Sequence, residues 1–299
     1  MAVIAIHFLS HSENNTRRTL SSKKQGQQIN HNIPLLSSEE DHKLGDGCYH
    51  IFLDIGSNIG VHTRFLFEPD LYPNAKTSIS LFEKEFGVHR NNKDFCAFGF
   101  EPNPIHEIRH KMLMNEYKKM GWRYHYIQAG ASDEDGNITF YRQEDQAYEE
   151  WGFTSNHDVQ SNNGLSVNVP TIRLATWLRD EIIDRKIPDR VYGKYDTGPR
   201  IVMKLDIESS EYKVLPDLMF TGILCNINFV FMEIHDWSIN YDTDSISGRG
   251  ELHLQQGRSQ KFLQDNIKMF HSMKDCATRI EEADDEAYLH DGMPFPSES

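Results

Sequence analysis

The stretch from Ile51 to Gly60 constrains the fold of this chain more than any other part of the sequence. It reads Ile-Phe-Leu-Asp-Ile-Gly-Ser-Asn-Ile-Gly: an apolar run that ends in an acid, then two glycines around small polar residues. The apolar run predicts a short buried strand, and the residues after Gly60 predict a helix with one apolar face. Because a glycine-rich turn lets a ligand approach backbone N–H groups at a helix N-terminus, this arrangement suits a nucleotide-like cofactor.

The spacing of the glycines narrows the class of cofactor. A dinucleotide fingerprint has three glycines in the pattern G-x-G-x-x-G and an acid about 20 residues later. Here three residues separate Gly56 from Gly60, Asp54 already ends the strand, and the next acid at a strand end is Glu101. A cofactor with an amino-acid tail and no pyrophosphate therefore fits better than a nicotinamide dinucleotide, which disfavours an oxidoreductase.

Length and charge set broad limits on the architecture. The chain has 299 residues and a formal net charge of −14, from 45 acids against 31 lysines and arginines. This length allows one large α/β domain with appendages or two small domains, and we favour one domain. Neutralising nucleic-acid phosphates requires clustered basic residues, so the acidic balance disfavours a nucleic-acid partner.

The four cysteines show no C-x-x-C spacing, which excludes the usual zinc signatures. Cys96 and Cys225 border apolar runs, where free buried thiols are the default expectation. The cysteines alone do not decide the redox compartment.

Both ends of the chain look separate from the predicted core. Residues 1–44 read as a flexible arm or stem, because they are polar beyond an apolar run over residues 2–9 that is too short to cross a bilayer. Residues 45–280 form the predicted domain, and residues 281–299 form an acidic tail that we expect to be frayed. No transmembrane segment is predicted in this chain. We favour a cytoplasmic location, with a secretory location as the alternative if an anchor was truncated; the oligomeric state stays open.

A second strand, residues 96–101, ends in Glu101, and Pro102-Asn103-Pro104 then opens a helix to about residue 120. Ile105, Ile108 and Met112 share one side of this helix, which we expect to be its apolar face. A carboxylate at a strand end can accept two hydrogen bonds from ribose hydroxyls. The alternative is that Glu101 is solvated or caps the helix.

The segments around this unit are less regular. Residues 67–95 form an insertion with a predicted helical turn over 80–86, which either roofs the cofactor site or packs on the core. Residues 123–129 predict a strand, and the small residues of the turn at 130–133 leave room for a flat ring. An alternating strand over 137–141 is followed by a long polar loop over 142–170, which either lies near the substrate side or is a surface excursion. An amphipathic helix around Leu174, Trp177 and Leu178 comes next, with Trp177 expected in the core.

Two further strands, residues 201–206 and 228–233, bring polar side chains to the same edge. They deliver Asp206, Glu208, Glu233 and His235 to the edge where the glycine turn lies. Four such residues arriving together favour a functional site. A helix follows from Tyr212, and Pro216 is expected to limit or restart it.

Three motifs in order carry a resemblance to a known family. Residues 54–60, 100–104 and 204–211 resemble the motifs of FkbM-type class I methyltransferases, over about residues 51–235. The resemblance implies an α/β fold, a Rossmann-like sheet with helices on both faces, S-adenosylmethionine as cofactor, and usually O-methylation. Two departures stand out: Ser209 replaces a glycine after Asp-Ile-Glu, and the insertion over 67–95 is longer than in compact members.

The resemblance also implies roles for individual residues. The first motif lines the methionine end of the cofactor, Glu101 the ribose, and Ser132 and Asp133 the adenine. The implied cofactor-binding residues are Asp54, Gly56, Ser57, Asn58, Gly60, Glu101, Pro102, Ser132, Asp133 and Asp206.

The expected chemistry is in-line methyl transfer to a hydroxyl or carboxyl acceptor, of small-molecule, glycan or lipid type. His235 is the candidate base, because its ordinary pKa is near 7, and Asp206 and Glu208 orient the substrate or the cofactor amine. The acids around His235 are also possible metal ligands, but we expect a hydrogen-bonded cluster without metal. The alternative function is a catalytically inactive, methyltransferase-like binding module.

Overall fold

The structure, a computed structural model, describes residues 42–142, 165–189, 197–235, 261–283 and 291–296. The chain divides into two units, residues 1–41 and 42–299, and all described residues belong to the second. The predicted arm therefore lies outside the described residues except for residues 42–44, and the boundaries given above for arm, domain and tail stay predictions.

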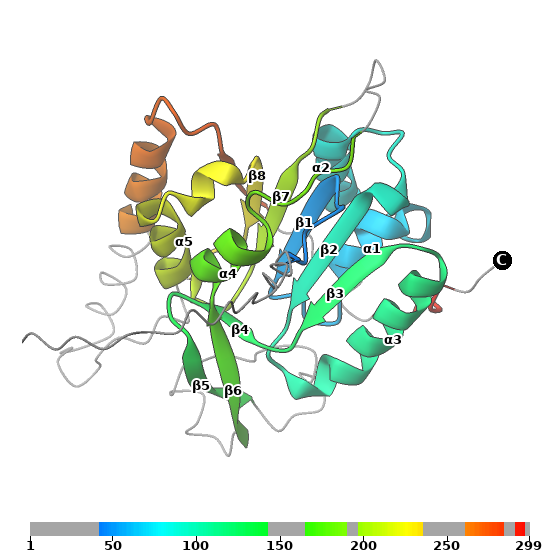
Figure 1. Ribbon diagram of the computed structural model, residues 1–299. Coiled ribbons are helices and arrows are strands. Elements are labelled where there is room, and N and C mark those ends of the chain that lie inside the picture. The colour runs from blue at the N-terminus through cyan, green and yellow to red at the C-terminus, as the bar shows by residue number, and fades with distance from the viewer. Residues whose placement is uncertain (1–41, 143–164, 190–196, 236–260, 284–290, 297–299) are drawn as a thin grey trace, which may run out of the picture. The chain divides into compact units, whose positions relative to one another are not determined.

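A parallel sheet of six strands forms the centre of the second unit, as an α/β fold requires (Figure 1). The strand order is β3-β2-β1-β7-β8-β9. The central strands β1, β2, β7 and β8 are buried along their whole length, as expected of parallel strands covered on both faces. The bounds are β1 His50–Ile55, β2 Phe95–Phe100, β3 Arg123–Ile127, β7 Ile201–Leu205, β8 Phe229–Met232 and β9 Arg279–Glu282.

Helices cover both faces of this sheet, which confirms the predicted Rossmann-like arrangement. One face packs on α4 (Leu174–Glu181), α5 (Glu211–Phe220) and a helix over 261–271. The other packs on α1 (Val61–Phe67), α2 (Lys76–Phe86) and α3 (Glu107–Lys119). Trp177 of α4 contacts Phe98 and Phe100 edge-on, which confirms that it is a core residue.

A smaller sheet of order β4-β6-β5 lies beside the main one (Figure 1). Its strands are β4 Gly130–Ser132, β5 Gly136–Arg142 and β6 Leu165–Arg173. The prediction of a turn over 130–132 and of loop up to Pro170 was wrong at these strands. The signal missed was the alternation of Leu165, Val167 and Val169 with polar residues, which is the period of a half-buried strand. The rest of the predicted loop, residues 143–164, lies outside the described residues.

The predicted apolar face of α3 was wrong. Ile105, Ile108 and Met112 are 43%, 73% and 44% exposed, whereas His110 and Tyr117 are fully buried. Hydrogen bonds explain the inversion, because the inward polar groups find partners: His110 bonds the Asn58 carbonyl, and Tyr117 donates to Glu68.

Pro216 does not end a helix. It lies inside α5, which continues to Phe220. The proline ring removes one i→i−4 hydrogen bond from the helix interior, and the helix continues past it.

The insertion over 67–95 packs on the core and does not roof a site at the carboxyl edge. Its helix α2 is longer than the single turn predicted, and Phe82 and Phe86 contact Phe52, His50 and Phe95. Two of these residues, His50 and Phe95, begin their strands. The insertion thus covers the amino-terminal half of the sheet.

Both cysteine pairs form disulfides, which corrects the expectation of free thiols. Cys48 joins Cys96 on β2, and Cys225 joins Cys276 before β9, at sequence separations of 48 and 51 residues. Each partner comes close only when distant parts of the sheet assemble, so local sequence gives no sign of the pairing.

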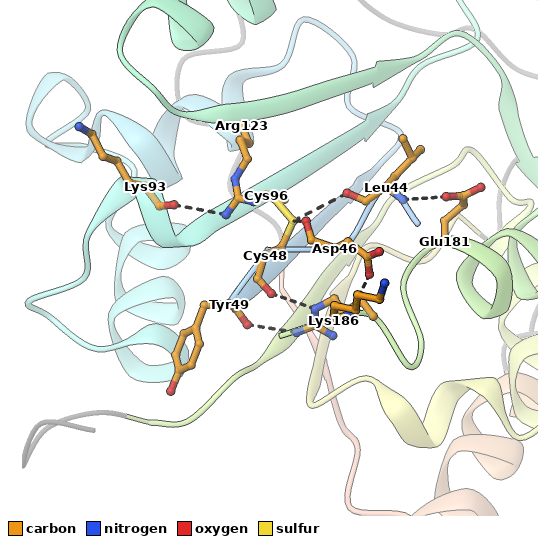
Figure 2. The surroundings of a disulfide bond; sticks show 10 residues. Leu44, Asp46, Cys48, Tyr49, Lys93, Cys96, Arg123, Glu181 and Lys186 are labelled. Carbon is orange, nitrogen blue, oxygen red and sulfur yellow. Dashed lines mark hydrogen bonds between the residues drawn. A yellow bond between two sulfur atoms is a disulfide. The ribbon is translucent and has the colours of Figure 1, made fainter. Parts of the chain in front are cut away.

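Around Cys48 the chain before β1 is fixed by contacts shown in Figure 2. The Arg185 guanidinium donates to the carbonyls of Cys48 and Tyr49, both at 3.1 Å, and the Lys186 backbone N–H donates to Asp46. This network closes the amino edge of the sheet.

The described parts of the acidic tail are ordered rather than frayed. Residues of β9 pair with β8, and the Asp291 carboxylate is fully buried. In the described residues we find no helix with the length and apolar character needed to cross a bilayer.

Candidate active site

The turn from Gly56 to Gly60 connects β1 to α1 at the carboxyl edge of the sheet, and only glycine fits its first position. Gly56 has φ +78°, and a Cβ there would lie 1.7 Å from the Asp206 carbonyl oxygen. Asn58 and Gly60 also have positive φ, 49° and 79°. The backbone of β7 therefore passes so close that any side chain at position 56 would separate the two strands.

Lys204 ties this turn to β7. Its ammonium donates to the Gly56 carbonyl and to the Asp206 carboxylate, both at 2.7 Å. Burial opposes the charge, but Asp206 and Asp54 raise the pKa of Lys204 above its ordinary value. Lys204 is thus a buried cation that holds the turn, a role that sequence reasoning missed although the residue stands in the third motif.

Glu101 ends β2 beneath the same turn. Its two carboxylate oxygens accept backbone N–H groups of Asn103 at 2.7 Å and Asn58 at 2.8 Å. Burial raises the pKa of Glu101 to about 8, even though these two bonds favour the carboxylate. Fixed at both oxygens, the group keeps further lone pairs for hydroxyl donors.

Two residues of α3 hold the other carbonyls of the turn. His110 Nε2 donates to the Asn58 carbonyl at 2.7 Å, which leaves Nδ1 to accept from the Tyr124 hydroxyl at 2.7 Å. The Arg109 Nε donates to the Ile59 carbonyl at 2.7 Å. Sequence reasoning missed both, since nothing in the helical pattern distinguishes them from surface polar residues.

A pocket opens at this edge of the sheet. Three of its lining residues, Glu101, Asp206 and Glu208, bear carboxyl groups, which stabilise a cationic ligand when they are ionised. The lining residues are Gly56, Asn58, Glu101, Pro102, Asn103, His106, Phe140, Asp206, Ile207 and Glu208.

Of the residues named from the sequence, six line this pocket, and Asn103, His106, Phe140 and Ile207 were missed. Phe140 arrives from the second sheet, which no motif signals. The named residues that are not among the lining residues are Asp54, Ser57, Gly60, Ser132, Asp133 and His235.

Asp54 lies under the turn, fully buried, and accepts a hydrogen bond from the Thr63 hydroxyl at 2.9 Å. Burial raises its pKa to about 6. Its Oδ1 is without a hydrogen-bond partner among the residues the structure describes. Ser132 donates to Asp133 at 3.2 Å at the end of β4.

His235 follows β8 at the centre of an acidic cluster. Its ring nitrogens lie 3.2 Å from Glu211, 3.2 Å from Glu233 and 3.7 Å from Asp206. Burial alone would lower the pKa of His235, but hydrogen bonds to Glu211 and Glu233 and the surrounding carboxylates raise it to about 11. A histidine that already carries its proton at neutral pH is a poor general base, which argues against the role expected from its ordinary pKa.

Glu208 lines the pocket beside this cluster, with Oε2 4.0 Å from His235 Nε2. Burial raises the pKa of Glu208 to about 7. Glu208 and Ser209 have φ of 53° and 78°, a left-handed backbone that non-glycine residues rarely adopt. Ser209 thus keeps the left-handed turn, at a cost in backbone strain.

The acidic cluster around His235 could also bind a divalent cation. Asp206, Glu211 and His235 each offer a ligand atom, and these atoms lie within 4.8 Å of one another. A protonated histidine that attracts carboxylates brings the same atoms equally close, so these distances alone do not indicate a metal.

Comparisons with known proteins agree with the motifs. The model of the methyltransferase FkbM domain matches residues 54–269. A crystal structure of methyltransferase FkbM from Methylobacillus flagellatus KT is similar over 57% of this chain and 29% of that chain, with 15% identity and a TM-score of 0.30. The present chain thus spans less than a third of that protein's length, and no curated protein matches it. The match over most of the sequence shows that the chain belongs to the FkbM methyltransferase domain family.

Proposed function

We propose that this chain binds S-adenosylmethionine at the carboxyl edge of its sheet and methylates an acceptor oxygen. The observation that carries the proposal is the Glu101 carboxylate, which lines the pocket and is fixed at both oxygens by backbone N–H groups. A carboxylate so placed suits the paired hydroxyls of a ribose. Gly56 and Asn58 of the turn also line this pocket, which supports a cofactor lying against the turn.

The charge of the pocket also supports this cofactor. Glu101, Asp206 and Glu208 line it, and a cationic sulfonium and ammonium are stabilised by such carboxylates. Asp206 is held in place by Lys204 at 2.7 Å, and we assign Asp206 to the amino-acid end of the cofactor. When bound, S-adenosylmethionine supplies an activated methyl group.

Glu208 fits the role of general base better than His235. Its pKa of about 7 lies near the operating pH, its Oε2 lacks a hydrogen-bond partner in the described part of the chain, and it faces the pocket. His235, as a cation, positions the carboxylates of Glu208, Glu211 and Glu233. The proposal requires no metal in this cluster, so EDTA leaves transfer unchanged.

The disulfides bear on where the reaction takes place. All four cysteines are paired, and disulfides persist in oxidising compartments. This favours the secretory alternative over a cytoplasmic location. The acceptor is then a small molecule, glycan or lipid with a free hydroxyl or carboxyl group.

The test is calorimetric titration with S-adenosylhomocysteine. We expect micromolar binding by the wild-type chain and a loss of at least about tenfold in Glu101→Gln, since charge-assisted hydrogen bonds contribute about 1.5–3 kcal/mol. Glu281→Gln on β9, a similar change at a partly exposed acid, is the control and keeps wild-type affinity. A folded wild-type chain that does not bind would leave a partner-binding module as the better account.

Protonation gives a second readout. Because Glu101 has a pKa of about 8 in the free protein and accepts hydroxyls as a carboxylate, binding at pH 7 releases a proton. The affinity therefore rises as the pH rises from 7 towards 8, and the enthalpy at pH 7 depends on the buffer. Glu101→Gln removes both effects.

A further inference from the structure

The C-terminal segment over residues 291–296 contacts α1 and α3 through a buried ionic network. Both side-chain oxygens of Asp291 are used: Oδ2 accepts from Arg64 at 2.6 Å and from Arg109 at 2.5 Å, and Oδ1 accepts from the Tyr72 hydroxyl at 3.0 Å. The side chains of Arg64 and Asp291 are both fully buried. An ion pair so buried stabilises the fold only while it is complete, because a single unpaired charge is costly to bury.

The backbone of the segment adds to the network. Arg64 also donates to the carbonyls of Met293 and Pro294, at 3.1 and 2.7 Å. The Phe295 ring lies 5.9 Å from the Arg64 guanidinium and 5.3 Å from that of Arg109, within the range of cation–π contact. Residues 291–296 therefore pack specifically against α1 and α3 and are not a solvated chain end.

Arg109 connects the C-terminal segment to the turn over residues 56–60, the proposed cofactor turn. One side of its guanidinium donates to Asp291, and its Nε donates to the Ile59 carbonyl at 2.7 Å. Arg109 is partly exposed, with 23% of its side chain accessible, so packing alone does not fix its rotamer. The carboxylate of Asp291 supplies the missing constraint.

The turn needs this constraint because its conformation is unfavourable in isolation. Asn58 has φ 49° and Gly60 has φ 79°, and Ile59 lies between them. The Asn58 amide is held by Glu101 and its carbonyl by His110, whereas the Ile59 carbonyl is held by Arg109. Release of Arg109 frees the half of the turn next to α1.

We infer that Asp291 is a positioning residue for cofactor binding, which acts through Arg109 on the Ile59 carbonyl and makes the C-terminal segment part of the cofactor site. The predicted effect on affinity rests on the proposed cofactor. The predicted ordering of residues 58–61 by Arg109 does not depend on the cofactor. Loss or displacement of residues 291–296 weakens cofactor binding without any change in the pocket's lining residues.

The experiment is a double-mutant cycle on Asp291→Asn and Arg109→Met, with S-adenosylhomocysteine affinity as the readout. Each single variant lowers the affinity about fivefold, and the double variant loses no more than either one, because both act on one carbonyl. Tyr72→Phe is the matched control: it removes another hydrogen bond to Asp291, lowers stability, and leaves the affinity within about twofold of wild type. Full additivity in the cycle, or wild-type affinity in both single variants, overturns the inference.

Hydrogen exchange of the ligand-free protein keeps the test independent of the cofactor. Asp291→Asn and Arg109→Met speed the exchange of amides in residues 58–61, while Tyr72→Phe does not. If Asp291→Asn fails to fold because Arg64 loses its partner, the Arg109→Met variant still tests the inference, since it leaves the Arg64–Asp291 ion pair intact. Unchanged exchange at residues 58–61 in Arg109→Met contradicts the inference. Failure of the wild-type chain to bind S-adenosylhomocysteine refutes the proposed function instead.

Discussion

The two edges of the central sheet are built differently. At the amino edge, the strand starts are closed by the Cys48–Cys96 disulfide (Figure 2), the Arg185 guanidinium and the phenylalanines of α2. At the carboxyl edge lie left-handed residues, buried acids and carboxylate oxygens without partners among the described residues, including those of Asp54 and Glu208. Unsatisfied groups and backbone strain cost stability, so their presence at the carboxyl edge supports placing the candidate site there.

Because of this difference, we expect substitutions at the amino edge to change the stability of the fold, and substitutions at the carboxyl edge to change ligand binding. Changes at the amino edge lower the free energy of unfolding and leave the pocket intact. Changes at the carboxyl edge are expected to alter the turn over residues 56–60, where we propose that the cofactor binds, and some of them are expected to relieve backbone strain. The predictions below run from the largest expected effect to the smallest.

Gly56→Ala has the largest effect. A methyl group at this position meets the Asp206 carbonyl and requires β1 and β7 to separate, so the free energy of unfolding falls by about 5 kcal/mol and cofactor binding is lost. Gly222→Ala is the control, because it has φ +73° but nothing within 4 Å of the added carbon, and it costs about 1 kcal/mol. Urea unfolding measures both; equal losses in the two variants would refute the close approach.

Removal of the Cys48–Cys96 disulfide by a double Cys→Ala substitution comes next. It frees a loop of 48 residues in the unfolded chain, which lowers the free energy of unfolding by about 4 kcal/mol. Affinity for S-adenosylhomocysteine stays at the wild-type value, because the disulfide lies at the opposite edge. A drop in affinity under conditions where circular dichroism shows an intact fold would contradict the separation of the two edges.

His235 gives the molecule a pH-dependent stability. Its pKa of about 11 lies above the ordinary value, so its contribution is complete below pH 6.5 and is lost as the pH rises towards 11. The free energy of unfolding therefore falls by about 2 kcal/mol between pH 7 and 9. In His235→Gln this decrease disappears, whereas His271→Gln, at an exposed position on the helix over 261–271, retains it. A wild-type slope in His235→Gln means that His235 is neutral in the folded protein.

Ser209→Gly has the smallest effect and the opposite sign. Glycine adopts φ 78° without penalty, so the substitution raises the free energy of unfolding by about 0.5 to 1 kcal/mol. Ser210→Gly, at φ −69°, is the matched control and lowers it by a similar amount. Thermal unfolding distinguishes the two; destabilisation by Ser209→Gly would show that the serine side chain outweighs the strain.

The fold was predictable where the pattern was local and strong. The strands that carry Asp54, Glu101 and Asp206 follow from apolar runs that end in acids, and their parallel order follows from the helices between them. The inward face of α3 was not predictable, because hydrogen-bonded His110 and Tyr117 are buried while Ile108 is exposed. Hydropathy cannot detect a polar residue whose partner is 50 residues away.

The site was predictable in part for the same reason. Glu101 and Gly56 stand in motifs, whereas Phe140 comes from a second sheet and Asp291 from the far end of the chain. The pKa of His235 depends on carboxylates of residues 206–211 and of Glu233, which the fold brings together, so the ordinary pKa of histidine does not indicate its raised value. Contacts between distant segments are set by topology, which single motifs do not encode.

The most direct test of the two-edge account is hydrogen exchange of the wild-type chain with and without S-adenosylhomocysteine. The account predicts slower exchange for backbone amides in residues 56–61, 101–103 and 206–209, and no change in residues 45–50 and 92–96. Protection at the amino edge, or none at the carboxyl edge with ligand bound, would contradict the assignment of the cofactor site.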